Sequence, residues 1–119
     1  MAMSMVRIKG NSHLMTLINK LRKEKTAIWS KAAEMLERPR RNRVEVNLSK
    51  IDRYGKDGLV VLVPGKVLGE GKLSKKLTVA AFSFSASAEK SISESGGKTV
   101  EIESLLEKGV EPKNILLLS

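Results

Sequence analysis

The spacing of hydrophobic residues changes near residue 43, and this change limits the possible folds more than any other feature of the sequence. Between residues 14 and 36, apolar residues recur every three or four positions, which is the period of an amphipathic helix. In VEVNLSKI, residues 44–51, apolar and polar residues alternate, as they do in a half-buried strand. The sequence therefore predicts a helical segment followed by a domain that contains strands.

The helical segment divides into two short helices. Residues 1–10 show no pattern and are expected to form a flexible N-terminal arm. Asn11 or Ser12 is suited to cap the first helix, and Thr26 to cap the second, because short polar side chains can accept hydrogen bonds from the free N–H groups of a first turn. Pro39 ends the second helix. Two helices joined by so short a link predict a helical hairpin over residues 11–39.

The remainder, residues 43–119, reads as an α/β core in which short strands and helices alternate. With 119 residues and 41% hydrophobic residues, the chain is expected to form a single compact domain over residues 1–119. The predicted elements after the strand at 44–51 are a turn at 54–58, a strand at 59–63 that ends at Pro64-Gly65, a glycine- and lysine-rich loop, a strand at 77–85, a helix at 88–95, an extended piece at 100–102, a helical turn at 104–108 and a strand at 115–118.

The charge is strongly positive and unevenly distributed. The net charge is +9, and the residues through Lys76 include 18 basic and 7 acidic side chains. Such a charge favours a polyanionic partner. The chain contains no cysteine, which excludes disulfides and thiolate metal sites. Its longest apolar run, Leu59 to Val63, is far shorter than the ~20 residues that span a bilayer. A soluble cytoplasmic protein without a membrane partner is expected.

The glycine- and lysine-rich segment VPGKVLGEGKLSKK, residues 63–76, does not match the known phosphate-binding loop motifs. The Walker pattern would require glycine where Lys66 stands and a hydroxyl where Leu73 stands. The dinucleotide pattern would require a third glycine where Ser74 stands. Both motifs also need a following helix, whereas the next segment reads as a strand.

Other catalytic signatures are missing as well. His13 is the sole histidine, and no GxSxG motif surrounds any serine. Glu101, Glu103 and Glu107 read as ordinary surface charge. The sequence therefore predicts no enzyme, no catalytic residue, no metal site, no cofactor and no small-molecule substrate.

Basic residues gather in two segments. In ERPRRNR, residues 37–43, arginines surround the helix break at Pro39, and their planar guanidinium groups match phosphate oxygens. The second group is the glycine- and lysine-rich segment, whose glycines would let the main chain approach a phosphate or sugar. Aromatic residues, which would stack on splayed bases, make up only 3%, so folded RNA is the expected ligand. The predicted RNA-binding residues are Arg7, Lys9, Arg38, Arg40, Arg41, Arg43, Lys66, Lys72, Lys75 and Lys76, with backbone approach at Gly65, Gly69 and Gly71.

The sequence resembles the archaeal and eukaryotic large-subunit ribosomal protein family L-eighteen-e. The resemblance rests on LERPRRNRVEVNLSKIDRY (36–54) and VPGKVLGEGKLSKKLTVAAFSFS (63–85), and continues in the Ile28-Trp29 helix and the Gly96-Gly97 turn. It implies an irregular β-β-α superhelical core, similar to the C-terminal part of bacterial large-subunit protein fifteen. It also implies a structural component of the large subunit that binds ribosomal RNA, on the ribosome and beside other ribosomal proteins, and that is monomeric when isolated.

Three alternatives remain open from the sequence. The first is a non-ribosomal protein that binds or processes structured RNA through the same basic face. The second is a nucleotide-binding enzyme. The third is a protein–protein interaction module whose charge serves only solubility.

Overall fold

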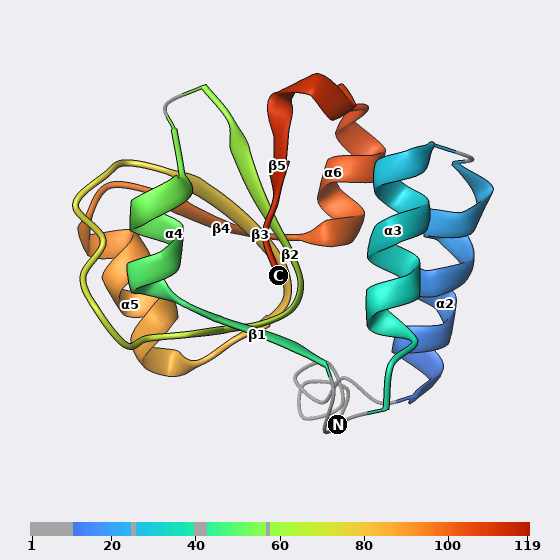
Figure 1. The fold of residues 1–119 in the computed structure, drawn as a ribbon, viewed down its shortest axis with the longest axis horizontal. Coiled ribbons are helices and arrows are strands. Elements are labelled where there is room, and N and C mark those ends of the chain that lie inside the picture. The colour runs from blue at the N-terminus through green and yellow to red at the C-terminus, as the bar shows by residue number, and fades with distance from the viewer. Residues whose placement is uncertain (1–10, 25, 40–42, 57) are drawn as a thin grey trace, which may run out of the picture.

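The computed structural model describes residues 11–24, 26–39, 43–56 and 58–119. In it, two helices lie side by side at one side of a parallel sheet, so the helical hairpin predicted for residues 11–39 is present (Figure 1). The elements follow in the order α2 (Asn11–Lys23), α3 (Ala27–Leu36), β1 (Val44–Asn47), α4 (Leu48–Tyr54), β2 (Val60–Leu68), β3 (Thr78–Phe84), α5 (Ala86–Glu94), β4 (Lys98–Glu101), α6 (Ile102–Lys108), the 3₁₀ turn η2 (Pro112–Asn114) and β5 (Ile115–Leu117).

All strand pairs are parallel, and β2 is the strand that organises them. The sheet order is β1-β2-β3-β4, and β5 also pairs with β2. Because β3 occupies one edge of β2, β1 and β5 share the other edge. Residues 65–68 of β2 pair with β1, and residues 60–62 pair with β5. One nine-residue strand therefore binds three others, which fits the α/β class predicted from the sequence.

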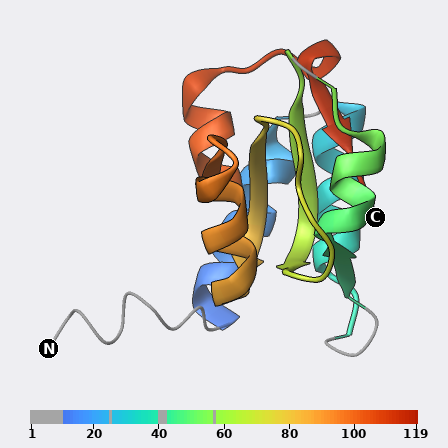
Figure 2. The ribbon, with the colours of Figure 1, turned by 90° about the vertical axis from the view of Figure 1, so that its left-hand side faces the viewer.

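Two apolar clusters cover the two faces of the sheet. Side chains alternate along β2: Val61 and Val63 join the cluster beneath α4 and α5, and Leu62 joins the cluster beneath α2, α3 and α6. The helices consequently form one layer on each side of the sheet (Figures 1 and 2). Burial of both faces explains the continuous apolar run LVVLV, because a central parallel strand has no solvent-facing side.

The predicted end of the second strand at Pro64-Gly65 is wrong, because β2 continues to Leu68. A register shift between Val63 and Lys66 accommodates Pro64, which has no N–H to donate to a neighbouring strand. Gly65 pairs with Val44, and its missing side chain leaves room for the main chain of β1. The first part of the segment predicted as a loop is therefore a strand.

The predicted strand over residues 44–51 is correct only as far as Asn47. The helix α4 begins at Leu48 and buries Leu48 and Ile51, three positions apart on one face. The alternation in Val44, Val46 and Leu48 fits both a strand and this strand-to-helix junction, and the tertiary packing decides between them. Likewise, α6 begins at Ile102, a residue that the sequence pattern placed in an extended piece.

Particular residues mark several helix ends. Ser85 is the N-cap of α5, and its hydroxyl accepts a hydrogen bond from the Ala88 N–H at 3.1 Å. Thr26 is the N-cap residue of α3, as predicted, but the predicted capping bond is absent, because its hydroxyl donates to the Glu24 carbonyl. Gly109 ends α6 in the left-handed region, with φ of 65°.

Candidate nucleic-acid interface

The first predicted basic group lies at the junction between α3 and β1. Arg38 is exposed just beyond the end of α3, and its carbonyl accepts a hydrogen bond from Arg43 Nε at 3.2 Å. That bond ties Arg43, at the start of β1, to the end of the hairpin. Arg40 and Arg41 lie outside the described residues, as do Arg7, Lys9 and the predicted arm at residues 1–10.

Arg43 and Lys66 line the same cleft. Its volume is about 310 Å³, and it lies where β1, β2 and β3 run side by side. Lys66 is exposed and stands in register with Glu45 on β1 and Ser83 on β3. The cleft therefore offers two cations and a hydroxyl group as donors, which suits a phosphate oxygen. Its remaining lining residues are Val44, Glu45, Gly65 and Phe82.

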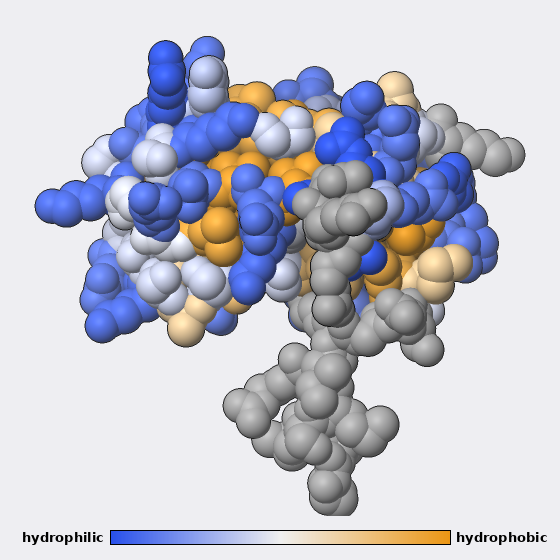
Figure 3. Space-filling view, turned by 60° about the horizontal axis from the view of Figure 1, so that its bottom comes forward, coloured by the Kyte–Doolittle hydropathy of each residue, from blue (hydrophilic) through white to orange (hydrophobic). Residues whose placement is uncertain are grey.

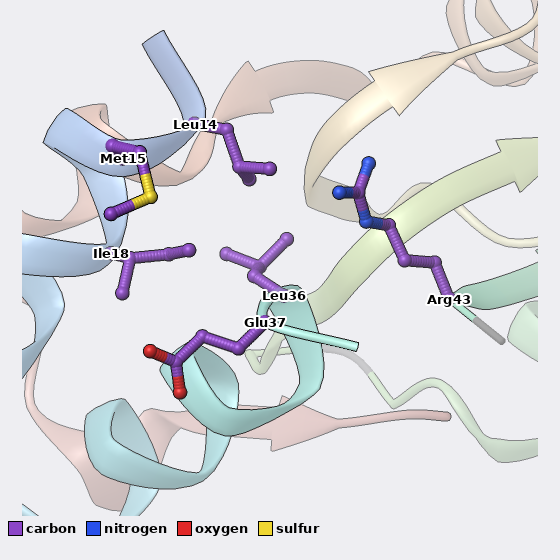
Figure 4. Close-up of a pocket in the computed structure, with 6 residues that line it drawn as sticks. All are labelled: Leu14, Met15, Ile18, Leu36, Glu37 and Arg43. Atoms are coloured by element: carbon purple, nitrogen blue, oxygen red, sulfur yellow. The ribbon is translucent and has the colours of Figure 1, made fainter. Parts of the chain in front are cut away.

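Arg43 and Glu37 also border a second pocket of about 350 Å³, whose other lining residues are apolar. Leu14, Met15 and Ile18 project into it from α2, opposite Leu36 at the end of α3 (Figure 4). In the view of Figure 3, hydrophilic residues cover most of the surface and apolar residues gather between them. The basic junction thus lies beside apolar surface.

The rest of the second predicted basic segment, residues 69–76, contacts α4 through Gly71, Ser74 and Lys75. The Asp52 carboxylate accepts hydrogen bonds from the N–H of Ser74 at 2.9 Å and from its hydroxyl at 2.8 Å. These bonds lower the pKa of Asp52, with the N–H contributing most. Lys75 is half-buried, and its ammonium donates to the carbonyls of Asp52 and Gly55 at 2.7 and 2.9 Å. Its charge therefore stabilises the C-terminal end of α4, where free carbonyls favour a cation.

The three glycines predicted to approach RNA lie against the protein itself. A Cβ added to Gly65 would come within 2.1 Å of the Val44 carbonyl oxygen, and one added to Gly69 within 2.8 Å of the Ala88 nitrogen. Gly71 has φ of 95°, and an added Cβ would lie 2.9 Å from the Ser49 nitrogen. These positions need glycine for intramolecular packing, and Gly65 is buried. RNA contact at the three glycines stays a prediction.

Lys72 and Lys76 are exposed on the same loop. Lys72 follows Gly71, which packs against Ser49 of α4, whereas the aliphatic chain of Lys76 lies beside Gly96 at the end of α5. Exposed Lys50 and Arg53 of α4 belong to this basic region too, and the sequence analysis did not include them. If residues 48–54 are placed on a helix, Lys50 and Arg53 lie on the face opposite the buried residues Leu48 and Ile51. Lys50 also donates to the Ser119 carbonyl.

Acidic side chains pair with other cations. Within the described part of the chain, the salt bridges between basic side chains and carboxylates involve His13 and Lys20 with Glu103, Arg22 with Glu37, and Lys113 with Glu111. None of these involves the predicted RNA-binding cations that the structure describes. Lys75 is nevertheless close enough to the Asp52 carboxylate for its charge to help lower the pKa of that group, and Glu45 lines the same cleft as Arg43 and Lys66.

Among the described residues, no helix is both long and apolar enough to cross a bilayer.

Comparison with known proteins gives consistent results. A family model described as "Ribosomal proteins 50S-L15, 50S-L18e, 60S-L27A" matches residues 12–100. A protein of Archaeoglobus fulgidus named large ribosomal subunit protein eL18 is 43% identical over 114 residues, which cover 92% of this chain and 97% of that protein. Proteins of the same name from Sulfurisphaera tokodaii (43% identity, 96% of this chain and 98% of that one) and Methanothermobacter thermautotrophicus (44%, 92% and 94%) are equally similar. The resemblance inferred from the sequence is confirmed, and the chain belongs to the ribosomal protein family of 50S-L15, 50S-L18e and 60S-L27A.

Proposed function

We propose that this protein is a structural constituent of the large ribosomal subunit that binds and stabilises folded ribosomal RNA through phosphate contacts. The observation that carries the proposal is membership of a ribosomal protein family together with a net charge of +9. Ribosomal proteins of this family are not enzymes, so the nucleotide-dependent alternative is set aside. The corresponding location is the ribosome in the cytoplasm, where neighbouring ribosomal proteins are further partners.

Two surfaces are proposed to contact RNA. The junction surface comprises Arg38, Arg43 and Lys66, and Arg40 and Arg41 extend it along the sequence. The loop surface comprises Lys72, near α4, and Lys76, near the end of α5. Support comes from the exposure of Arg38, Lys66, Lys72 and Lys76, with Arg43 half-buried. None of these five cations forms a salt bridge with a carboxylate of the described residues. Lys75 contributes less, because its ammonium already donates to two carbonyls.

The mechanism is counterion release. Each phosphate that a cation neutralises frees condensed salt ions, so the affinity falls as salt rises. If about six phosphates are contacted, the logarithm of the affinity should fall against the logarithm of salt with a slope on the order of −5. Filter binding to folded large-subunit RNA fragments across a potassium chloride series measures this slope, and a slope near zero would contradict the mechanism.

A matched pair of double variants tests the junction surface. Replacing Arg43 and Lys66 with alanine should weaken binding and make the salt slope shallower by roughly 1.5. Replacing Arg22 and Lys113 removes the same charge from side chains that already have carboxylate partners, and should change the slope less. Equal effects of the two variants would mean that only total charge matters.

Co-sedimentation with large ribosomal subunits distinguishes a ribosomal component from a non-ribosomal RNA-binding factor.

Arg40→Ala combined with Arg41→Ala tests the arginine stretch directly. We expect weaker RNA binding with a nearly unchanged thermal transition. Substantial unfolding of this variant would mean that these side chains are structural.

A further inference from the structure

Three metal-ligating side chains from separate elements meet at the edge of the sheet. His13 lies in the first turn of α2, Glu101 ends β4, and Glu103 lies in the first turn of α6. One ligand atom from each residue lies within 4.8 Å of the other two, and His13 Nε2 is 3.4 Å from Glu103 Oε1. The sequence predicts ordinary surface charge for Glu101, Glu103 and Glu107 and no metal site, because nothing in the order of residues places His13 beside them.

Apolar packing supports this arrangement. Ile102, between the two glutamates, is buried in the same cluster as Leu14, the neighbour of His13. The His13 ring also packs against the Phe82 ring, with 5.8 Å between centroids. The side chain of Glu103 is only 19% exposed, and that of His13 36%. The three donors are therefore held together by the hydrophobic contact of α2 with β4 and α6.

We propose that His13, Glu101 and Glu103 bind a divalent cation of the zinc class and thereby join the helical hairpin to the sheet. Zinc takes imidazole nitrogen and carboxylate oxygen at ~2.0–2.2 Å, and tetrahedral geometry then sets neighbouring donors about 3.4 Å apart. The His13–Glu103 separation of 3.4 Å has this value, and the Glu101 donor lies within 4.8 Å of both atoms. Three protein ligands leave a fourth position for water.

Lys20 modulates the site. Its ammonium donates to Glu103 Oε2 at 2.8 Å, whereas His13 faces the other oxygen, Oε1. A cation on Oε1 therefore leaves the contact with Lys20 in place, but the two positive charges repel each other. Lys20→Met, which keeps the aliphatic stem and removes the charge, should bind the metal more tightly than the unmodified protein.

The sole histidine makes the test specific. The protein is purified without a polyhistidine tag, so that His13 is the one imidazole and no thiol competes for the metal. Zinc chloride is titrated by calorimetry and by NMR of the imidazole carbons. We expect saturable binding of one metal ion per chain, perturbed His13 signals, and a rise in Tm of roughly 10 °C at about a hundredfold excess over Kd.

Variants separate a metal site from a simple ion pair. His13→Gln and Glu101→Gln should each lower the affinity at least about tenfold. Glu107→Gln removes the same charge from α6 at a residue outside the cluster, and its affinity should stay within about twofold. Glu101 and Glu107 are exposed, so both variants should keep the fold, which circular dichroism checks. Non-saturable binding, or equal effects of Glu101→Gln and Glu107→Gln, would overturn the proposal.

Discussion

Replacing Gly65 with alanine should destabilise the protein through one steric contact. The added Cβ would lie 2.1 Å from the Val44 carbonyl oxygen and 2.8 Å from its carbonyl carbon. Ordinary contact begins near 3.4 Å, so β1 would have to move by about 1.3 Å. The obstacle is main chain of the paired strand, which cannot rotate away as a side chain can. A shift at this contact would therefore disturb all the hydrogen bonds between β1 and β2.

The expected loss is about 3 kcal/mol. Overpacking of a well-packed interior costs ~1–3 kcal/mol, and the shift also disturbs the pairing of residues 44–47 with residues 65–68. This is a large share of the ~5–15 kcal/mol that holds a typical domain folded. Gly109→Ala provides the comparison, because Gly109 has φ of 65° but nothing within 4 Å of an added Cβ. It should cost only the left-handed backbone penalty, about 1 kcal/mol.

Urea unfolding measures both variants. Fluorescence of Trp29, the single tryptophan, reports on the hairpin, and far-UV circular dichroism reports on the whole chain. Coincident transitions would justify a two-state free energy. The steric reasoning fails if Gly65→Ala lies within about 0.5 kcal/mol of the unmodified protein, or if Gly109→Ala costs as much.

Three further changes test the fold. Ser85→Ala removes the side-chain acceptor of the Ala88 N–H and should cost about 1 kcal/mol in urea unfolding; no change would mean that water replaces the cap. Leu21→Ala empties a fully buried position between the hairpin and the sheet and should cost ~2–5 kcal/mol, with a smaller cost indicating that the helices collapse into the space. Because the bonds from Ser74 lower the pKa of Asp52, their contribution to stability is present above the ordinary pKa of 3.8 and is lost as the pH falls through the folded-state value. Ser74→Ala removes the hydroxyl bond, so an NMR titration should show the pKa of Asp52 rising towards 3.8; an unchanged pKa would contradict this assignment.

Local patterns were sufficient for elements that are decided by local interactions. The two helices of the hairpin follow from their apolar spacing, and the structure has them at residues 11–23 and 27–36. Residues 48–54 were misread because their conformation depends on which face is buried. The alternation that begins at Val44 has no local signal for the change to a helix at Leu48.

The roles of the glycine- and lysine-rich segment could not be read from composition. Glycine and lysine occur both in flexible basic loops and in strands whose main chain packs closely against a neighbouring strand, so the composition does not distinguish the two. Only the tertiary structure shows that Gly65 makes room for β1 and that Lys75 bonds to the end of α4. The exposure of Lys66 and Lys72 agrees with the RNA-binding prediction, which binding experiments must test.

The parallel pairing of β2 sets the order in which the chain can mature during synthesis. Hydrogen bonds to residues 60–62 on one edge come from β5, more than fifty positions later in the chain. Until the ribosome has released residues 115–117, that edge has no permanent neighbour, and its main-chain N–H and C=O groups are open to pairing with other nascent chains. The protein is therefore expected to reach its final form only after translation of its last strand, so that chaperone protection matters most in the interval before it.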